Sequence, residues 1–170
     1  MNAKLIVYRL VTFILLPIAG LNALSVIGIL PTAFSNPLML IAVFLSCAII
    51  IYTFSSFIFL TKGIQNGKTL KSSFKDLIKV NAYVVIAYTA MVLIVVIVYF
   101  ASPVLQKMVY DNLAKLPSSM NPNNISKEEL VHTFRSALIF FGAYSAVLLF
   151  HIIITLQLIK KYKALFTTPS

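Results

Sequence analysis

Four long apolar runs alternate with shorter polar segments along this chain. Each run holds about twenty residues, enough for a helix to cross a hydrocarbon core about 30 Å thick. The predicted membrane spans are residues 11–30, 38–60, 80–100 and 136–159. The pattern therefore predicts an all-α integral membrane protein, a four-transmembrane-helix bundle that forms a single membrane domain over residues 1–170.

The segment between the third and fourth runs, residues 102–135, has a different pattern. Ser102-Pro103 is typical of a helix N-cap followed by proline, and Ser126 with Glu129 has the spacing of a capping box. Turn-forming residues lie between these two signals, so the insert is predicted to be a helical hairpin between spans 3 and 4. Its first helix carries an apolar stripe suited to docking a partner helix or a lipid surface, formed by Leu105, Met108, Val109, Leu113 and Leu116.

Composition and charge support the membrane interpretation and orient the spans. The chain is 60% hydrophobic and 11% charged, against about a quarter charged in a soluble domain. Ten of the 14 Lys and Arg residues lie before span 1, in residues 61–79 or after span 4. The positive-inside rule then predicts cytoplasmic termini, a basic cytoplasmic loop over residues 61–79 and an extracytoplasmic insert.

The basic loop has two explanations. Four of its lysines are candidate contacts for anionic lipid, namely Lys68, Lys71, Lys75 and Lys79. The simpler explanation is that these charges only hold the loop on the cytoplasmic side. Nucleic acid is not an expected partner, because the chain has no Arg-rich block and no basic surface interleaved with aromatic residues.

His151 is the ionisable residue that lies inside a predicted span. Such residues usually face a bundle interior or a cavity and are functional candidates. The spacing places Tyr144 and Thr155 on its helix face, and other spans supply further amides. The candidate intramembrane polar cluster is Asn22, Asn81, Tyr144, His151 and Thr155. Two roles stay open for His151: an interhelical hydrogen bond to Asn22, Asn81 or a serine, and a proton or ligand site.

Several kinds of chemistry are disfavoured. No Asp or Glu occurs in any predicted span, which argues against ion-coupled transport. Cys47 is the single cysteine, so no disulfide within the chain and no multi-cysteine metal site can form. The second histidine, His132, lies in the insert, which argues against a haem held by two histidines. We expect no enzymatic activity, no metal and no cofactor.

The layout of four short spans, a lysine-rich middle loop that begins TKGIQNGK and a polar helical insert resembles a group of bacterial proteins. These are small four-span inner-membrane proteins of the domain-of-unknown-function type. The resemblance implies the same fold and a bacterial inner-membrane location, and it implies no activity.

These observations favour a non-enzymatic membrane protein that acts through partners, as a scaffold, assembly factor or accessory subunit. The expected partners are the lipid bilayer and either another membrane protein or further copies of this chain. The alternative is a small oligomeric channel or transporter with a polar path around His151. A membrane enzyme comes third.

Overall fold

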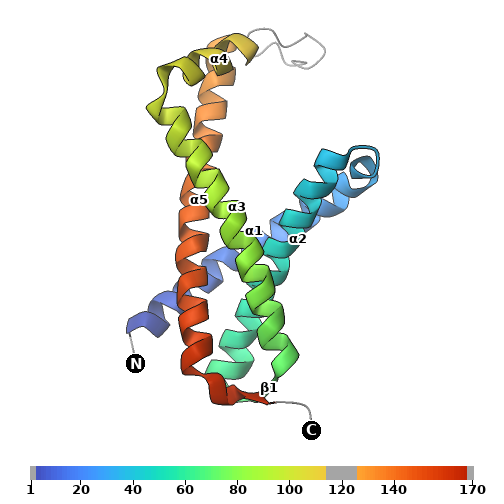
Figure 1. The fold of residues 1–170 in the computed structure, drawn as a ribbon, viewed down its shortest axis with the longest axis vertical. Coiled ribbons are helices and arrows are strands. Elements are labelled where there is room, and N and C mark those ends of the chain that lie inside the picture. Colours follow the sequence, from blue (N-terminus) through green and yellow to red (C-terminus); the bar gives the residue numbers. More distant parts are fainter. Residues whose placement is uncertain (1–2, 114–125, 168–170) are drawn as a thin grey trace. The chain divides into compact units, whose positions relative to one another are not determined.

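The computed structural model describes residues 3–113 and 126–167, and almost all of these are helical. Figure 1 shows the long helices α1, α2, α3 and α5 and the short helix α4. The elements are α1 (Ala3–Ala33), α2 (Pro37–Ile58), the π-helix η1 (Phe59–Gln65), β1 (Leu70–Lys71), α3 (Ser72–Ala101), α4 (Pro103–Leu113), α5 (Lys127–Lys161), the 3₁₀-helix η3 (Lys163–Leu165) and β2 (Phe166–Thr167).

Four helices in the described residues are long and apolar enough to cross a membrane: α1, α2 continued by η1, α3 and α5. Each contains one predicted span, so the prediction of an all-α protein with four helices of membrane-spanning length and apolarity is confirmed. The helices extend beyond the predicted spans, because α3 begins at Ser72 and α5 begins at Lys127. Large apolar side chains on α1, such as Leu21, Leu24 and Ile27, are about two-thirds exposed, as expected for a surface that contacts lipid.

The chain divides into two compact units, which we describe separately. Unit 1 comprises residues 1–88 and 147–170, and unit 2 comprises residues 89–146. The helices α3 and α5 each contribute residues to both units. That residues 1–170 form a single membrane domain stays a prediction.

In unit 1, the predicted basic loop is tied to the end of the helical core. β1 pairs in parallel with β2, with Leu70 opposite Phe166. The Phe166 ring stacks on Phe59 of η1 at a centroid distance of 5.5 Å. Gly63 is buried in η1, where a Cβ atom would lie 3.1 Å from Leu70 Cδ1. The two-stranded sheet was not predicted, because a pairing of two residues leaves no periodic pattern in the sequence.

In unit 2, both predicted helix starts are confirmed. The Leu105 N–H donates to Ser102 Oγ at 3.3 Å, and the Glu129 N–H donates to Ser126 Oγ at 3.2 Å. These hydroxyls satisfy backbone donors that have no partner within their helices. The turn of the predicted hairpin lies outside the described residues, so the hairpin itself stays a prediction.

The helices α3 and α5 pack closely within unit 2. A Cβ atom at Gly142 would lie 3.3 Å from Val96 Cγ1, so the absence of a side chain there lets the helices approach. Further along, the Tyr99 and Phe134 rings meet edge to face at 5.6 Å. Gln106 on α4 donates its side-chain amide to the carbonyl oxygens of Tyr99 and Phe100, both at 3.3 Å. These bonds fix the start of α4 against the end of α3.

Candidate functional site

His151 lies at the centre of a cluster of polar side chains buried in unit 1. It is fully buried on α5, one helical turn before Thr155. Thr155 Oγ1 donates to the His151 carbonyl oxygen at 2.8 Å, a bond that threonine commonly makes inside helices. The two residues that the sequence placed on one face are therefore in direct contact.

The helix α2 supplies Tyr52, whose hydroxyl bridges the two polar residues of α5. Tyr52 Oη lies 2.8 Å from His151 Nδ1 and 2.8 Å from Thr155 Oγ1. The phenol ring meets the imidazole edge to face, with the ring centroids 5.7 Å apart. A buried tyrosine usually needs a partner for its hydroxyl, and here one hydroxyl contacts two groups on another helix.

The helix α1 approaches the other edge of the imidazole. Thr12 Oγ1 lies 2.8 Å from His151 Nε2 and donates its own proton to the Tyr8 carbonyl oxygen at 2.7 Å. Because that proton is already used, we assign Thr12 Oγ1 as the acceptor of a proton on Nε2. Nδ1 then accepts from Tyr52. A neutral imidazole in this tautomer has both ring nitrogens satisfied.

Tyr8 completes the cluster from above the imidazole ring. Its ring stacks on His151 at a centroid distance of 4.9 Å and an interplanar angle of 14°. Its hydroxyl lies 2.7 Å from Ser56 Oγ and donates to the Ser56 carbonyl oxygen at 3.2 Å. Tyr8 therefore links α1 to α2 as well as to α5.

The whole cluster is closed to solvent. Each member has 0% exposed surface, and the members are Tyr8, Thr12, Tyr52, Ser56, His151 and Thr155. Their polar side-chain atoms bond to one another or to the helix backbone. Hydrogen bonds are stronger in such a low-dielectric interior than in water. The arrangement joins three helices and lines no open path in this structure.

The structure brings together only part of the predicted cluster. His151 and Thr155 meet, whereas Asn81 donates to the Leu77 carbonyl oxygen of its own helix at 2.9 Å. Asn22 is half-buried on α1, and neither amide bonds His151, whose nitrogens are used by Thr12 and Tyr52. Tyr144 belongs to unit 2 and is half-buried there.

The members that the sequence analysis missed follow a signal that the chain does carry. Each helix contributes two hydrogen-bonding residues four positions apart, which places them on one face. The three pairs are Tyr8 with Thr12, Tyr52 with Ser56, and His151 with Thr155. Ser56 lies close to other hydroxyl residues on α2, and its residue type alone does not distinguish it from them as an interhelical partner. One repeated spacing in three spans would have identified the contact.

One buried hydroxyl of unit 1 takes no part in the hydrogen bonds of the His151 cluster. Thr53 follows Tyr52 on α2 and is fully buried. Its Oγ1 has no hydrogen-bond partner within residues 3–113 and 126–167. A buried hydroxyl without a partner is costly, so Thr53 provides a test of the energetics in this core.

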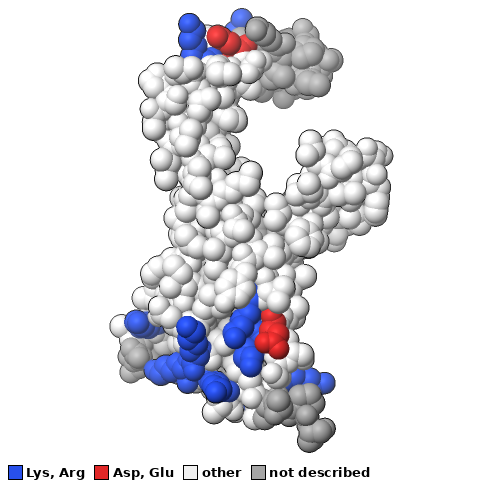
Figure 2. Space-filling view, in the orientation of Figure 1, with Lys and Arg blue, Asp and Glu red and all other residues white. Residues whose placement is uncertain are grey.

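The predicted lipid-contact lysines all lie in unit 1. Lys68 and Lys71 are exposed, and Lys75 and Lys79 are half-buried on the first turns of α3. Figure 2 shows Lys and Arg side chains gathered at the end of unit 1 that carries β1 and β2. Ten of the 14 basic residues and one of the four acidic residues belong to this unit. The lysines therefore stand in a strongly positive region.

The predicted docking face on α4 is only partly exposed. Leu105, Val109 and Leu113 are half-buried, while Met108 is 53% exposed. Leu116 lies outside the described residues. The large exposed hydrophobic side chains of α4 are Met108, Val104, which is 69% exposed, and Tyr110, which is 39% exposed.

Among the described residues, no group of three or more His, Cys, Asp or Glu side chains is placed to hold a metal ion. Comparison of the chain with protein-family models, with curated proteins and with solved structures finds no match.

Proposed function

We propose that this chain is a non-enzymatic, multi-pass protein of a bacterial inner membrane that acts through contact with a partner protein. In this role it is a scaffold, an assembly factor or an accessory subunit. Its termini and the end of unit 1 that carries β1 and β2 lie in the cytoplasm. The helix α4 lies on the opposite side of the membrane, within a helical hairpin.

The observation that carries the proposal is the exposed amphipathic helix α4. None of its described residues, Pro103–Leu113, is buried. Val104 and Met108 lie one helical turn apart and are exposed, so they form an apolar surface suited to packing against a partner helix. We infer that a partner helix covers these two side chains.

Charge supports the orientation. Unit 1 holds ten basic residues and one acidic residue, whereas unit 2 holds four basic and three acidic residues. Basic excess marks the cytoplasmic side of bacterial membrane proteins. The test uses a C47S background with one new cysteine, at Ser126 or at Lys163, and a membrane-impermeant maleimide on intact spheroplasts. Labelling at Ser126 alone supports this orientation, and labelling at Lys163 alone reverses it.

The partner contact is tested by a matched pair of double variants. V104A/M108A removes the two most exposed apolar side chains of α4, and M91A/I94A removes similarly exposed side chains from α3 in the same unit. A protein that co-purifies stoichiometrically with the wild type should be lost with V104A/M108A and retained with M91A/I94A. Equal retention by both variants contradicts the assignment to α4.

The alternative function, a small oligomeric channel or transporter, needs a polar path around His151. The closed cluster gives it less support, because both imidazole nitrogens are already bonded. Its test is solute and proton flux into liposomes that contain the wild type or H151A. A flux present in the wild type and abolished by H151A would favour this alternative.

A further inference from the structure

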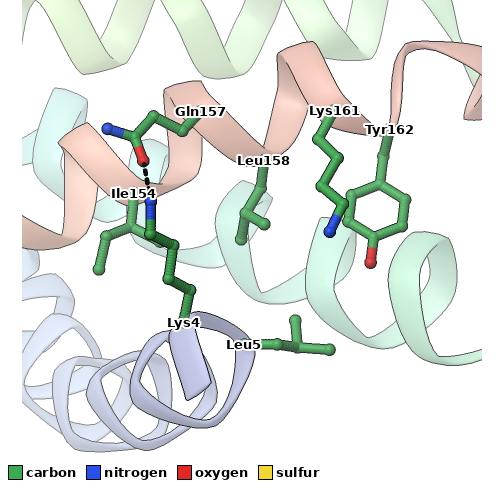
Figure 3. Close-up of a pocket in the computed structure, with 7 residues that line it drawn as sticks. All are labelled: Lys4, Leu5, Ile154, Gln157, Leu158, Lys161 and Tyr162. Atoms are coloured by element: carbon green, nitrogen blue, oxygen red, sulfur yellow. Dashed lines mark hydrogen bonds between the residues drawn. The ribbon is translucent and has the colours of Figure 1, made fainter. Parts of the chain in front are cut away.

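A pocket in unit 1 lies between the first turn of α1 and the last turns of α5, away from the His151 cluster. Its volume is about 330 Å³. Figure 3 shows its lining residues on facing helices, with Lys4 and Leu5 on α1 and Gln157, Leu158 and Lys161 on α5. Tyr162, which follows α5, lies at one end of the pocket.

The polar side of the pocket is built to receive an anion. Lys4 and Lys161 bring two ammonium groups to it, and no carboxylate lines it. Asp76 is the one acidic residue of unit 1, and no ion pair joins it to either lysine within the part of the chain that the structure describes. Two cations that share a pocket repel each other, and a bound anion turns that repulsion into attraction.

Neutral donors complete the polar side. Lys4 Nζ donates to Gln157 Oε1 at 3.5 Å, so the amide nitrogen of Gln157 is left to donate to a ligand. Lys161 Nζ lies 5.7 Å from the centroid of the Tyr162 ring, which holds the ammonium group at the pocket edge. Ammonium, amide and phenol groups together suit the oxygens of a phosphate group.

Apolar side chains also line the pocket, namely Leu5, Ile154 and Leu158. Leu5 also lines a neighbouring pocket of about 290 Å³, whose walls include Leu10, Phe13 and Leu60. A free phosphate ion has no apolar group to place against such walls, whereas a phospholipid carries acyl chains close to its phosphate. The pocket also lies where two membrane-length helices change from apolar to basic residues.

We propose that this pocket binds the phosphate diester of an anionic phospholipid, with Lys4 and Lys161 as its cations and Gln157 and Tyr162 as further donors. The proposal rests on the proposed function only for the cytoplasmic placement of this end of unit 1. It differs from the lipid contacts predicted on the lysine-rich loop, because here two cations line a pocket that also has apolar walls.

The test compares two double variants with the same loss of charge. K4Q/K161Q removes both pocket cations, and K160Q/K163Q removes two exposed neighbours that do not line the pocket. Native mass spectrometry of the detergent-solubilised protein, in equimolar phosphatidylglycerol and phosphatidylcholine, measures the preference for the anionic lipid. On the proposal, each lysine that contacts the lipid phosphate contributes about a fivefold preference, and lysines outside the pocket make no such contact. We expect K4Q/K161Q to reduce the preference about 30-fold and K160Q/K163Q to leave it within about twofold of the wild type.

Three results would overturn the proposal. Equal losses in both double variants would mean that the general positive charge of unit 1 attracts the lipid. Displacement of phosphatidylglycerol by an equal concentration of inorganic phosphate would mean a free-anion site without a lipid component. An unchanged preference in K4Q/K161Q would remove the pocket from lipid binding.

Two controls keep the test decisive. Melting curves in phosphatidylcholine show whether K4Q/K161Q is folded. If K4Q/K161Q is unfolded, the single variant K161Q is used in its place, with an expected loss of about fivefold in the preference for phosphatidylglycerol. The measurement uses the isolated protein, so its result does not depend on capture of a partner. A lipid preference without a partner contradicts the proposed function alone, and a partner without a lipid preference contradicts the pocket alone.

Discussion

The Tyr52 hydroxyl lies 2.8 Å from Nδ1 of His151 and joins α2 to α5 inside a region with no exposed surface. No water competes for this bond. The same oxygen lies 2.8 Å from Thr155 Oγ1. Loss of the Tyr52 hydroxyl would leave His151 Nδ1 without a partner, whereas Thr155 keeps its bond to the His151 carbonyl oxygen.

Replacement of Tyr52 by phenylalanine should destabilise the protein by about 1–3 kcal/mol, because the buried Nδ1 of His151 loses its partner while the packing volume is nearly unchanged. Unfolding by SDS titration in mixed micelles measures the loss. Y83F is the matched control, since Tyr83 is 61% exposed on α3, and it should change the free energy of unfolding by less than about 0.5 kcal/mol. Equal effects of the two substitutions would contradict a stabilising role for the cluster.

Two fully buried threonines should respond in opposite directions to the same substitution. T12V removes a hydroxyl bonded to His151 Nε2 and should destabilise the protein by about 1–3 kcal/mol. T53V removes a hydroxyl that has no partner in the described part of the chain and should stabilise it by about 1 kcal/mol. The same SDS titration measures both. A destabilising T53V would mean that this hydroxyl has a partner after all.

Glycine substitutions test the close approach of α3 and α5 in unit 2. G142V places a branched side chain against Val96, where even a Cβ atom would lie 3.3 Å from Cγ1. Overpacking of this kind costs about 1–3 kcal/mol. G28V changes the same residue type inside α1, where a Cβ atom meets nothing within 4 Å. The difference in melting temperature between the two variants isolates the packing cost, and no difference would contradict the contact.

The pairing of β1 with β2 should depend on Phe166. F166A removes the ring that stacks on Phe59, and we expect faster amide hydrogen exchange at Leu70 and Lys71, about tenfold for each 1.4 kcal/mol lost. F34A removes an aromatic ring that is 73% exposed and should leave exchange at β1 unchanged. Unchanged exchange in F166A would show that the strand pairing holds without the aromatic stack.

The sequence predicted the long helices and their starts, but it did not predict the contacts between helices in the core. A span needs a minimum apolar length, and this rule located all four long helices. Local capping also left a clear pattern, so Ser102 and Ser126 were correctly identified as helix starts. These features depend only on neighbours in the sequence.

The interior contacts depend on residues far apart in the chain, and single residue types do not reveal them. The interhelical partners predicted for His151 are Asn22, Asn81 or a serine. The observed partners are Thr12 and Tyr52, which can also bond to their own helix or face a membrane interface. Gly63 likewise gave no sign of its close approach to Leu70, because its meaning depends on a strand that pairs with the C-terminal segment.

The His151 cluster also imposes an order on biosynthesis. Its tyrosines and Thr12 belong to the first two helices, whereas the imidazole that pairs with them is synthesised much later, on α5. Until α5 is synthesised, the Tyr52 hydroxyl therefore lacks both of the side chains that it contacts in the complete fold, although Tyr8 and Ser56 can already pair between α1 and α2.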